Sequence, residues 1–320
     1  MRIEGTMSDE AILHGALHTT AAWAPVDGLF RYPAGLSPDA ARRLLGLLPP
    51  GPVLDPFVGG GAVALAARRA GRAFVGRDVS EAALCITRAR CWLPTHAEAR
   101  AYRALVRERI DAGPAAPHLC DIDAPEPMRS AVHATLTATD TGRAGRLVEA
   151  ALRAWSAERE RVPAGTPEPD LARADARTLS LPSAVAGALT SPPYPGVYDY
   201  DRWTQALRAA RGQAGDIDDE IGTRRDFTAG TAAAMAGWRA DTRAWTRAVS
   251  RALRPGGRLV MVIGDGPRPD GPVDTRSESV DAARRAGLRL LAASTAEHGT
   301  RPSPRREHAL LFERPDTPSA

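Results

Sequence analysis

The sequence predicts an α/β domain built on a mostly parallel sheet. Short apolar segments at 52–57 and 73–79 each precede a helical pattern, at 59–71 and 80–92. Strands that alternate with helices at this spacing are typical of parallel sheets, because each crossover helix returns the chain to the same end of the sheet. A glycine-rich turn, "GGG", begins the first of these helices. Together these patterns favour an open sheet with helices on both faces.

The flanking segments extend this pattern. Before the first strand, Ser37 and Pro38 predict a helix start, with serine as N-cap, and Pro49-Pro50 predicts its end. Later, "DARTLSLP" and "AVAGALTSPPY" are expected to resume the sheet, and 241–257 is expected to form an amphipathic helix. The remaining elements are a strand at 258–266, a helix at about 274–286, and an antiparallel strand pair, "LRLLAAST" and "HALLFER", at the sheet's edge.

The rhythm of strands and helices is interrupted once, which defines the expected domain organisation. Residues 92–170 contain helical patterns separated by Pro- and Gly-containing links, so they predict a mostly helical insertion and a possible substrate-recognition element. Residues 28–91 and 171–315 are expected to form one catalytic domain, and residues 1–27 a partly ordered lead-in.

Composition limits the function classes. The chain has 320 residues, 43% of them hydrophobic and 25% charged, as in ordinary folded domains. No apolar run approaches the roughly 18 residues of a membrane span, and no signal peptide is expected. All 42 basic residues are Arg, and a net charge of +4 permits a nucleic-acid partner without requiring one. Three cysteines without a CxxC pair predict no metal site and fit a cytoplasmic location.

The first motif with chemical content is "LDPFVGGGAVALA" followed by "FVGRD". Gly59 and Gly61 form a loose dinucleotide-binding pattern, and Asp78 follows Gly59 by 19 residues, where a ribose-binding acid belongs. NAD and S-adenosylmethionine both present an adenosine ribose to such an acid. Asp55 favours the second cofactor, because a carboxylate there would repel a pyrophosphate and attract a cationic methionine group; Phe57 adds an apolar surface. A turn kept only for helix–sheet packing is the alternative.

The second motif is "SPPY", Ser191 to Tyr194, at the end of an apolar run. An exocyclic amine on a base is a poor nucleophile because its lone pair is delocalised into the ring. The Ser191 hydroxyl and the Pro192 carbonyl could accept hydrogen bonds from both N–H groups and localise that lone pair. Pro192 and Pro193 would keep the carbonyl from turning away, and Tyr194 could stack on the base. The alternative is a proline turn with a surface tyrosine.

Three further positions have weaker support. Asp175 could accept a hydrogen bond from the adenine amino group of a cofactor, or could cap a turn. In "FRYPAGLSP", Ser37 or Arg31 could reach the methionine carboxylate, and capping by Ser37 competes with that role.

With both motifs in hand, the chain resembles the amino-methyltransferases that modify exocyclic nitrogens of bases in DNA. The resemblance rests on Asp55-Pro56-Phe57-Val58-Gly59-Gly60-Gly61 and on Ser191-Pro192-Pro193-Tyr194, and it covers about 28–90 and 172–314. It implies a Rossmann-like methyltransferase fold with an antiparallel strand at the C-terminal edge, S-adenosylmethionine as cofactor, and DNA in preference to RNA as partner. The Ser-led tetrapeptide implies cytosine N4 more than adenine N6. Asp199 and Tyr200, which follow it, could support the pocket floor.

Two departures keep other acceptors open. Arg77 stands before Asp78, where a small or apolar residue is expected, and the only compact basic cluster is Arg301, Arg305 and Arg306. The same chemistry on a tRNA base, a nucleoside or a small-molecule amine is therefore an alternative. A nicotinamide-dependent oxidoreductase is a more remote one.

Overall fold

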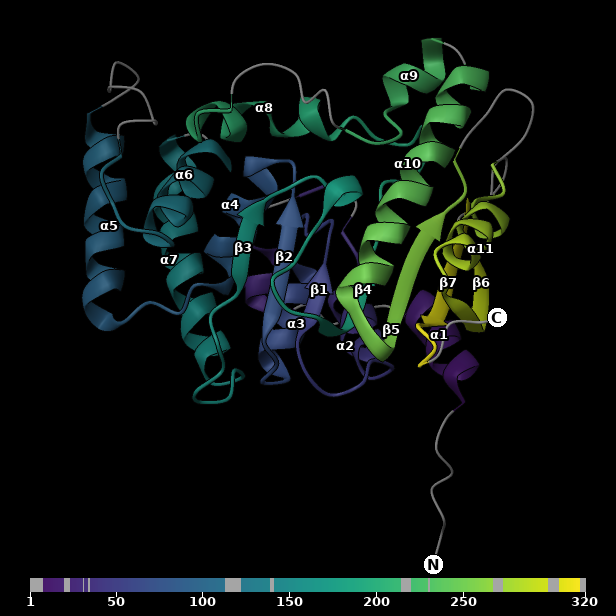
Figure 1. Ribbon diagram of the computed structural model, residues 1–320. Helices are drawn as coiled ribbons and strands as arrows, with labels where there is room; N and C mark the ends of the chain where they lie inside the picture. Colours follow the sequence, from purple (N-terminus) through teal and green to yellow (C-terminus); the bar gives the residue numbers. More distant parts are fainter. Residues whose placement is uncertain are drawn as a thin grey trace, which may run out of the picture.

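The computed structural model describes residues 8–19, 24–30, 32–33, 35–112, 122–138, 141–213, 220–229, 231–266, 273–298 and 305–316 (Figure 1). Its sheet has seven strands in the order β3-β2-β1-β4-β5-β7-β6. These strands are β1 (Val53–Asp55), β2 (Phe74–Asp78), β3 (Asp170–Arg173), β4 (Val185–Thr190), β5 (Leu253–Gly264), β6 (Arg289–His298) and β7 (Arg305–Glu313). Neighbouring strands from β3 to β5 pair in parallel, whereas β7 runs antiparallel to β5 and β6. The predicted fold class is confirmed, with β7 between β5 and the edge strand β6.

The helices follow the strands as crossovers and cover both faces of the sheet. The helices are α1 (Asp9–Leu17), α2 (Pro38–Leu45), α3 (Ala62–Arg69), α4 (Glu81–Cys91), α5 (His96–Asp111), α6 (Met128–Ala138), α7 (Thr141–Arg159), α8 (Tyr200–Ala210), α9 (Arg224–Ala229), α10 (Thr231–Ala252) and α11 (Thr275–Arg285). The described part of the chain also contains the 3₁₀ turns η1 (Pro25–Gly28) and η3 (Ala176–Thr178). The predicted caps are present: Ser37 accepts from Ala40 N, and Ser80 from Ala83 N.

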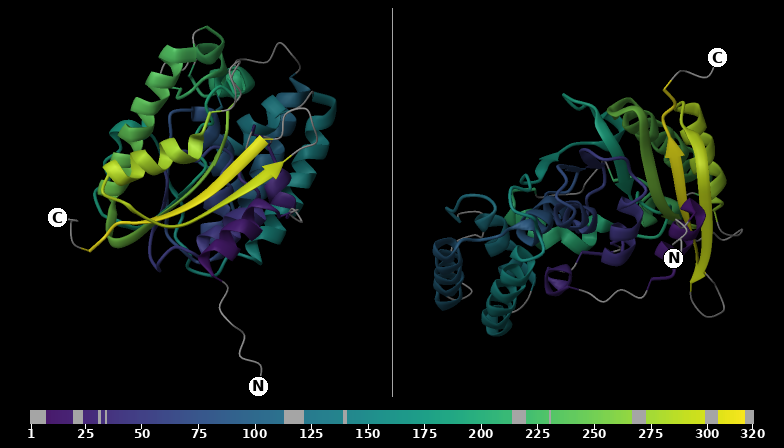
Figure 2. Two further views of the ribbon diagram at one scale, coloured as in Figure 1. Left: turned by 90° about the vertical axis from the view of Figure 1, so that its right-hand side faces the viewer. Right: turned by 90° about the horizontal axis from the view of Figure 1, so that it is seen from below.

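Two apolar layers enclose the sheet, because alternate strand residues face opposite sides. In β5, Val260 and Val262 belong to the core shared with α1 to α4. Leu259 and Met261 belong to the second core, shared with α10 and α11. The carboxyl ends of the parallel strands meet at the edge that α8 crosses (Figure 1). Figure 2 shows β6 and β7 as two long strands at the edge of the sheet that is farther from α5 and α6.

The glycine turn after β1 needs its glycines for two physical reasons. Gly59 and Gly61 have positive φ, 47° and 80°, which residues with a Cβ rarely adopt. A Cβ on Gly61 would also lie 2.7 Å from the Thr87 hydroxyl on α4. The turn therefore lets α3 and α4 approach closely, and it brings the start of α3 to the carboxyl end of β1.

Three predicted boundaries were wrong. The sheet resumes at Asp170 with β3, whereas "DARTLSLP" contains η3; the "DLAR" of β3 lacks the β-branched residues that mark strands. Helix α10 begins at Thr231, ten residues before the predicted start. Strand β5 begins at Leu253, because the "RPGG" segment bulges and the register to β4 shifts between Val185 and Gly187.

An ion pair with Asp170 explains why an arginine occupies position 77, where a small or apolar residue is expected. Its guanidinium makes a bidentate ion pair with Asp170, with Nη2 to Oδ2 at 2.9 Å and Nη1 to Oδ1 at 3.2 Å. Arg77 is 9% exposed whereas the Asp170 side chain is exposed, so the pair is a part-buried link between β2 and β3. A small residue at this position would leave the edge strand without that link.

Segments outside the predicted catalytic core pack on it. Helix α1, from the expected lead-in, contacts α2, β6 and β7. Helices α5 to α7 lie beyond the β3 edge (Figure 1), where α6 contacts α4 and α8. Within the described ranges, no helix combines the length and the apolar character needed to cross a membrane.

Aromatic rings pack together within the helical segment 92–170, and one of them also bonds to α4. Trp155 of α7 packs edge-on against Trp92 and Tyr102, with ring centroids 4.9 and 5.2 Å apart. Its indole N–H donates to the Ala89 carbonyl at 2.8 Å. Because Trp155 is 1% exposed, this contact joins α7 to α4 through both packing and a satisfied polar group.

Replacing Trp155 by alanine should lower the free energy of unfolding by about 3–5 kcal/mol, the usual loss for a large buried aromatic side chain. Urea unfolding followed by circular dichroism measures this. Trp203→Ala is the matched control, because Trp203 is 74% exposed and its loss should change stability by less than about 0.5 kcal/mol. Equal unfolding midpoints for the two variants would contradict an anchoring role of Trp155.

Candidate functional site

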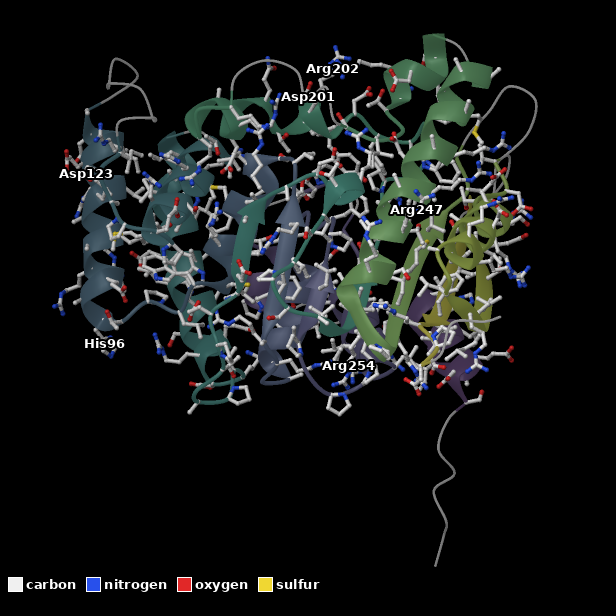
Figure 3. The ribbon with its side chains drawn as sticks, in the orientation of Figure 1. His96, Asp123, Asp201, Arg202, Arg247 and Arg254 are labelled. Atoms are coloured by element: carbon white, nitrogen blue, oxygen red, sulfur yellow. The ribbon has the colours of Figure 1, made fainter. Side chains whose placement is uncertain are left out.

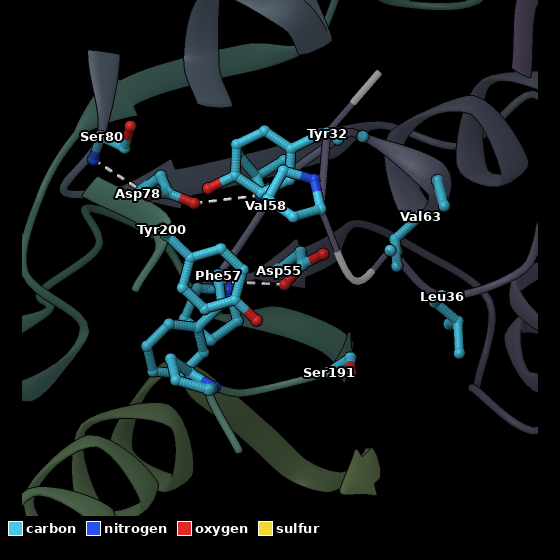
Figure 4. Close-up of a pocket in the computed structure, with 18 of the residues that line it drawn as sticks. Tyr32, Leu36, Asp55, Phe57, Val58, Val63, Asp78, Ser80, Ser191 and Tyr200 are labelled. Atoms are coloured by element: carbon cyan, nitrogen blue, oxygen red, sulfur yellow. Dashed lines mark hydrogen bonds between the residues drawn. The ribbon is translucent and has the colours of Figure 1, made fainter. Parts of the chain in front are cut away.

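A cavity of about 700 Å³ opens at the carboxyl ends of β1, β2 and β4. The strand order reverses between β1 and β4, which is the switch point where open α/β sheets bind ligands. Predicted site residues that line the cavity are Asp55, Pro56, Phe57, Gly59, Gly61, Asp78, Asp175, Ser191 and Pro193. Figure 4 shows the side chains of Asp55, Asp78, Tyr200 and Ser191 around this cavity. Two motifs more than 130 residues apart in the chain are therefore brought together.

Asp55 is a buried carboxylate at the end of β1. Its Oδ1 accepts from the Phe57 N–H at 3.1 Å and from the Thr190 hydroxyl at 2.7 Å. Among the described residues no hydrogen bond reaches Oδ2, so that oxygen can serve a ligand. Burial raises the pKa of Asp55 to about 7, against the opposing effect of the Thr190 and Phe57 hydrogen bonds.

Asp78 ends β2 and holds the glycine turn. Its Oδ2 accepts from the Gly59 N–H at 3.0 Å, and its Oδ1 accepts from the Ser80 N–H at 2.9 Å (Figure 4). Burial raises its pKa to about 6, which these backbone donors partly oppose. A ribose hydroxyl would bind to lone pairs that remain on oxygens already oriented by the backbone.

Phe57 and Asp175 lie on the side of the cavity toward α10. The Phe57 ring stands edge-on to Trp245, with centroids 5.4 Å apart, so its orientation is fixed by packing. Asp175 caps η3 by accepting from the Arg177 N–H at 2.8 Å, and it also binds the Arg177 guanidinium. Asp175 therefore caps η3, as the alternative interpretation expected, and it also lines the cavity.

Ser37 stands apart from the other predicted cofactor residues. Its hydroxyl accepts from Ala40 N at 3.1 Å, as the capping alternative proposed, and it lines a second cavity instead of the first. Arg31 lies outside the described residues. Arg301 and the side chain of Arg305 do too, whereas Arg306 pairs with Asp265 at 2.8 Å.

The "SPPY" turn connects two cavities. Ser191 lines the first cavity and also a second one of about 430 Å³, bounded by α1, α2, β5 and β7. Tyr194 lines the second, whereas Pro192 is buried and lines neither. The Tyr194 ring rests on Gly264, where a Cβ would come within 2.6 Å of it. Ser191 thus lies where ligands in the two cavities would meet.

Aromatic and acidic residues that sequence analysis did not assign to the cofactor also line the first cavity. Tyr32 and Tyr200 stack with ring centroids 5.9 Å apart and planes 13° apart. Glu220 accepts from the Tyr200 N–H at 2.6 Å at the start of α8, and burial raises its pKa to about 7. Asp199 accepts from Arg225 N at the start of α9. Tyr32 lies in "FRYP", a segment already considered for the methionine carboxylate, whereas Glu220 lies 26 residues after Tyr194.

Arg90 had no sequence signal, because it is one arginine among several in a helix. Its guanidinium donates to the carbonyls of Leu29, Phe30 and Gly60 at 2.6, 2.9 and 2.5 Å. Burial lowers its pKa to about 10. Arg90 holds the segment that carries Tyr32 against the glycine turn, and its donors are occupied by these carbonyls.

Acids outnumber bases around the first cavity. Among the described residues that line it, the acids are Asp27, Asp55, Asp78, Asp175 and Glu220, and the single base is Arg90. Asp27 pairs with Arg69 and Asp175 with Arg177. Burial raises the pKa values of Asp55, Asp78 and Glu220 to about 7, 6 and 7, so a cationic ligand would hold these three acids in the ionised form. A cationic ligand is favoured here over an anionic one.

A scan against protein-family models finds no match to the sequence, and neither does a search of curated proteins. The structure is similar to the rRNA methyltransferase aviRa from Streptomyces viridochromogenes, with TM-score 0.45 and 15% identity over 97% of this chain and 95% of that one. It is also similar to TrmN from Thermus thermophilus, with TM-score 0.40 and 17% identity over 91% of this chain; the chain spans 52% of TrmN. The glycopeptide N-methyltransferase MtfA complexed with S-adenosylmethionine gives TM-score 0.37 and 11% identity over 88% and 89% of the two chains. The names of aviRa and MtfA give different acceptors, rRNA and a glycopeptide.

The raised pKa of Asp55 predicts a specific pH dependence of stability. A carboxyl whose pKa rises on folding stabilises the fold below its unfolded pKa of about 4, and this contribution is lost as pH rises through about 7. Asp55→Asn removes the titration. Between pH 5 and pH 8 the variant should therefore gain on the order of 2 kcal/mol relative to the wild type.

Urea unfolding of both proteins at the two pH values measures this difference. Asp281→Asn, at an exposed carboxyl of α11, is the control and should show no such gain. A difference between Asp55→Asn and wild type that is the same at both pH values would show that Asp55 is ionised throughout.

Proposed function

We propose that the chain is an S-adenosylmethionine-dependent methyltransferase that acts on an exocyclic amine. The observation that carries this proposal is the single cavity shared by Asp55, Asp78 and Ser191 at the ends of β1, β2 and β4. Buried acids on a glycine turn suit a cationic cofactor, and the hydroxyl of a rigid Pro-Pro turn suits a planar amine. Because the tetrapeptide begins with serine, cytosine N4 in DNA is the proposed acceptor, in preference to adenine N6.

The residues around the first cavity fit this cofactor. When bound, S-adenosylmethionine supplies an electrophilic methyl group. Asp55 Oδ2 would accept from the methionine ammonium, and Asp78 from the ribose hydroxyls. Phe57 and Asp175 would border the adenine.

Pro56, Gly59 and Gly61 form the turn whose backbone the cofactor would approach. Ser37 would act through the α2 cap that it forms.

The acceptor amine would bind at Ser191, between the two cavities. Its two N–H groups would donate to Ser191 Oγ and to the Pro192 carbonyl, so that the nitrogen lone pair is localised and faces the methyl donor. Pro193 stiffens this turn, and its carbonyl accepts from the Trp238 indole at 3.5 Å. Tyr194 and Tyr200 would bound the base, which has to leave the DNA stack to reach this depth.

The cofactor assignment predicts the effect of changing Asp78. Asp78→Ala should weaken S-adenosylmethionine binding by about 1–3 kcal/mol, because the ribose hydroxyls lose their acceptor. Asp78→Asn, which keeps one carbonyl oxygen for the glycine turn, separates this loss from collapse of the turn. Titration calorimetry with S-adenosylmethionine and with NAD measures both. Binding of NAD alone to the wild type would establish the oxidoreductase alternative instead.

Ser191→Ala should slow methyl transfer by about 10- to 1,000-fold, the scale of one preorganised polar contact, and leave the cofactor dissociation constant nearly unchanged. Single-turnover transfer of a labelled methyl group measures the rate. Ser183→Ala, at an exposed residue before β4, is the matched control. An unchanged rate in Ser191→Ala would remove Ser191 from the acceptor site.

The same chemistry on a tRNA base, a nucleoside or a small-molecule amine is the second candidate. It is favoured by the composition of residues 92–170, where ten arginines face twelve acids. Among them, Arg103 pairs with Glu149 and Arg129 with Glu126. Paired arginines of this kind do not form a surface that follows a phosphate backbone.

Incubation with labelled S-adenosylmethionine and duplex DNA, tRNA or a metabolite extract decides between the two candidates. Label recovered as N4-methylcytosine in DNA supports the first proposal, and label confined to RNA or to a small molecule supports the second. Cofactor binding without label in any fraction would contradict both.

A further inference from the structure

Three polar side chains form a continuous chain from the methyl-transfer position to β7. The Ser191 hydroxyl donates to the Tyr194 phenol oxygen at 3.4 Å, and the Tyr194 hydroxyl donates to Glu307 Oε1 at 3.1 Å. Tyr194 and Glu307 border the second cavity, and Ser191 borders both cavities. Hydrogen bonds in an unliganded site are often long and shorten when substrate binds.

The chemistry of Glu307 sets the direction of this chain. An ionised carboxylate can only accept hydrogen bonds, so the phenol must donate to it. The phenol has one proton, and Ser191 must therefore donate to the phenol oxygen. The lone pairs of Ser191 Oγ then remain for the acceptor N–H group that points to this serine, while the other N–H group points to the Pro192 carbonyl. The negative charge of Glu307 also polarises the chain and strengthens Ser191 as a hydrogen-bond acceptor.

We propose that Glu307 is the terminal proton acceptor of the methyl transfer, reached through Ser191 and Tyr194. This inference rests on the proposed function, since it needs an amine bound at Ser191.

The relay from Ser191 through Tyr194 to Glu307 removes the proton that methyl transfer leaves on the acceptor nitrogen. When the C–N bond forms and the C–S bond breaks, the positive charge of the donor passes to the acceptor nitrogen. That nitrogen must lose one proton to become the neutral methylated amine. The proton moves to Ser191 Oγ while the serine proton moves to the Tyr194 oxygen and the phenol proton moves to Glu307, which becomes a neutral carboxylic acid.

The surroundings favour Glu307 over the other acids near the reaction. Asp265 also borders the second cavity, but its Oδ1 is bound by Thr275 and His308 and its Oδ2 by Arg306. Glu307 is half-buried, so its proton can pass to solvent. Burial raises the pKa of Tyr194 well above its usual range, which suits a phenol that gives up its proton only while receiving another.

Single-turnover methyl transfer to the acceptor found by labelling tests the relay in the full-length protein. Glu307→Gln and Tyr194→Phe should each lower the maximal rate by about 100-fold, with little change in the acceptor concentration for half-maximal rate or in cofactor affinity. The double variant should be no slower than the slower single variant, because both changes interrupt one chain. Glu297→Gln, at an exposed glutamate of β6, is the matched control and should keep the wild-type rate.

A small external acid anion distinguishes a proton acceptor from a structural residue. Formate should restore part of the rate in Glu307→Ala and should leave the rate of Glu297→Gln unchanged. Glu307→Asp should retain more activity than Glu307→Gln. Wild-type rates in Tyr194→Phe and Glu307→Gln would overturn the relay and leave the proposed function standing. A loss of rate in Glu307→Ala that formate does not relieve would do the same. Absence of any labelled acceptor would instead overturn the proposed function, and the relay with it.

Discussion

A buried hydrogen bond of 2.7 Å between the Thr190 hydroxyl and Asp55 Oδ1 joins the ends of two parallel strands. The two residues lie 135 positions apart in the chain. Asp55 begins the motif "DPFVGGG", and Thr190 immediately precedes the motif "SPPY". The bond orients Asp55 so that its other oxygen is left for a ligand, and it places Ser191 one residue from that contact. The distance between the positions proposed for cofactor and acceptor therefore depends on the pairing of β1 with β4.

Arginine makes most of the long-range polar connections around this centre. Arg90 binds three backbone carbonyls and holds the Tyr32 segment against the glycine turn, and Arg77 fastens β3 to β2. A guanidinium is suited to both tasks, because its planar set of donors can satisfy several fixed acceptors at once. A chain without lysine can thus use its basic residues inside the fold. Such residues add little to a surface for nucleic acid, which is why net charge is a weak guide to the acceptor here.

Segments outside the motifs complete both cavities. Helix α1 supplies Ala16 and Leu17 to the second cavity, and Tyr198 and Tyr200, just after the tetrapeptide, line both. Side chains on α8 lie over the carboxyl ends of the strands, where Asp201 and Arg202 are labelled in Figure 3. The N-terminal segment and the region after "SPPY" therefore line both cavities, while the sheet supplies the fixed chemical groups.

Local patterns in the sequence determined the strand–glycine turn–helix unit, the caps at Ser37 and Ser80, the antiparallel C-terminal strands and the two motifs. Each of these depends on neighbouring residues: a positive φ, a hydroxyl before a helix, or a short apolar run. The sequence could not indicate that Arg90 and Glu307 border the site, because a single charged residue in a helix or strand carries no local signal. Nor could it separate the two cavities that meet at Ser191. Those features depend on which strand ends lie side by side, and only the long-range packing of the sheet decides that.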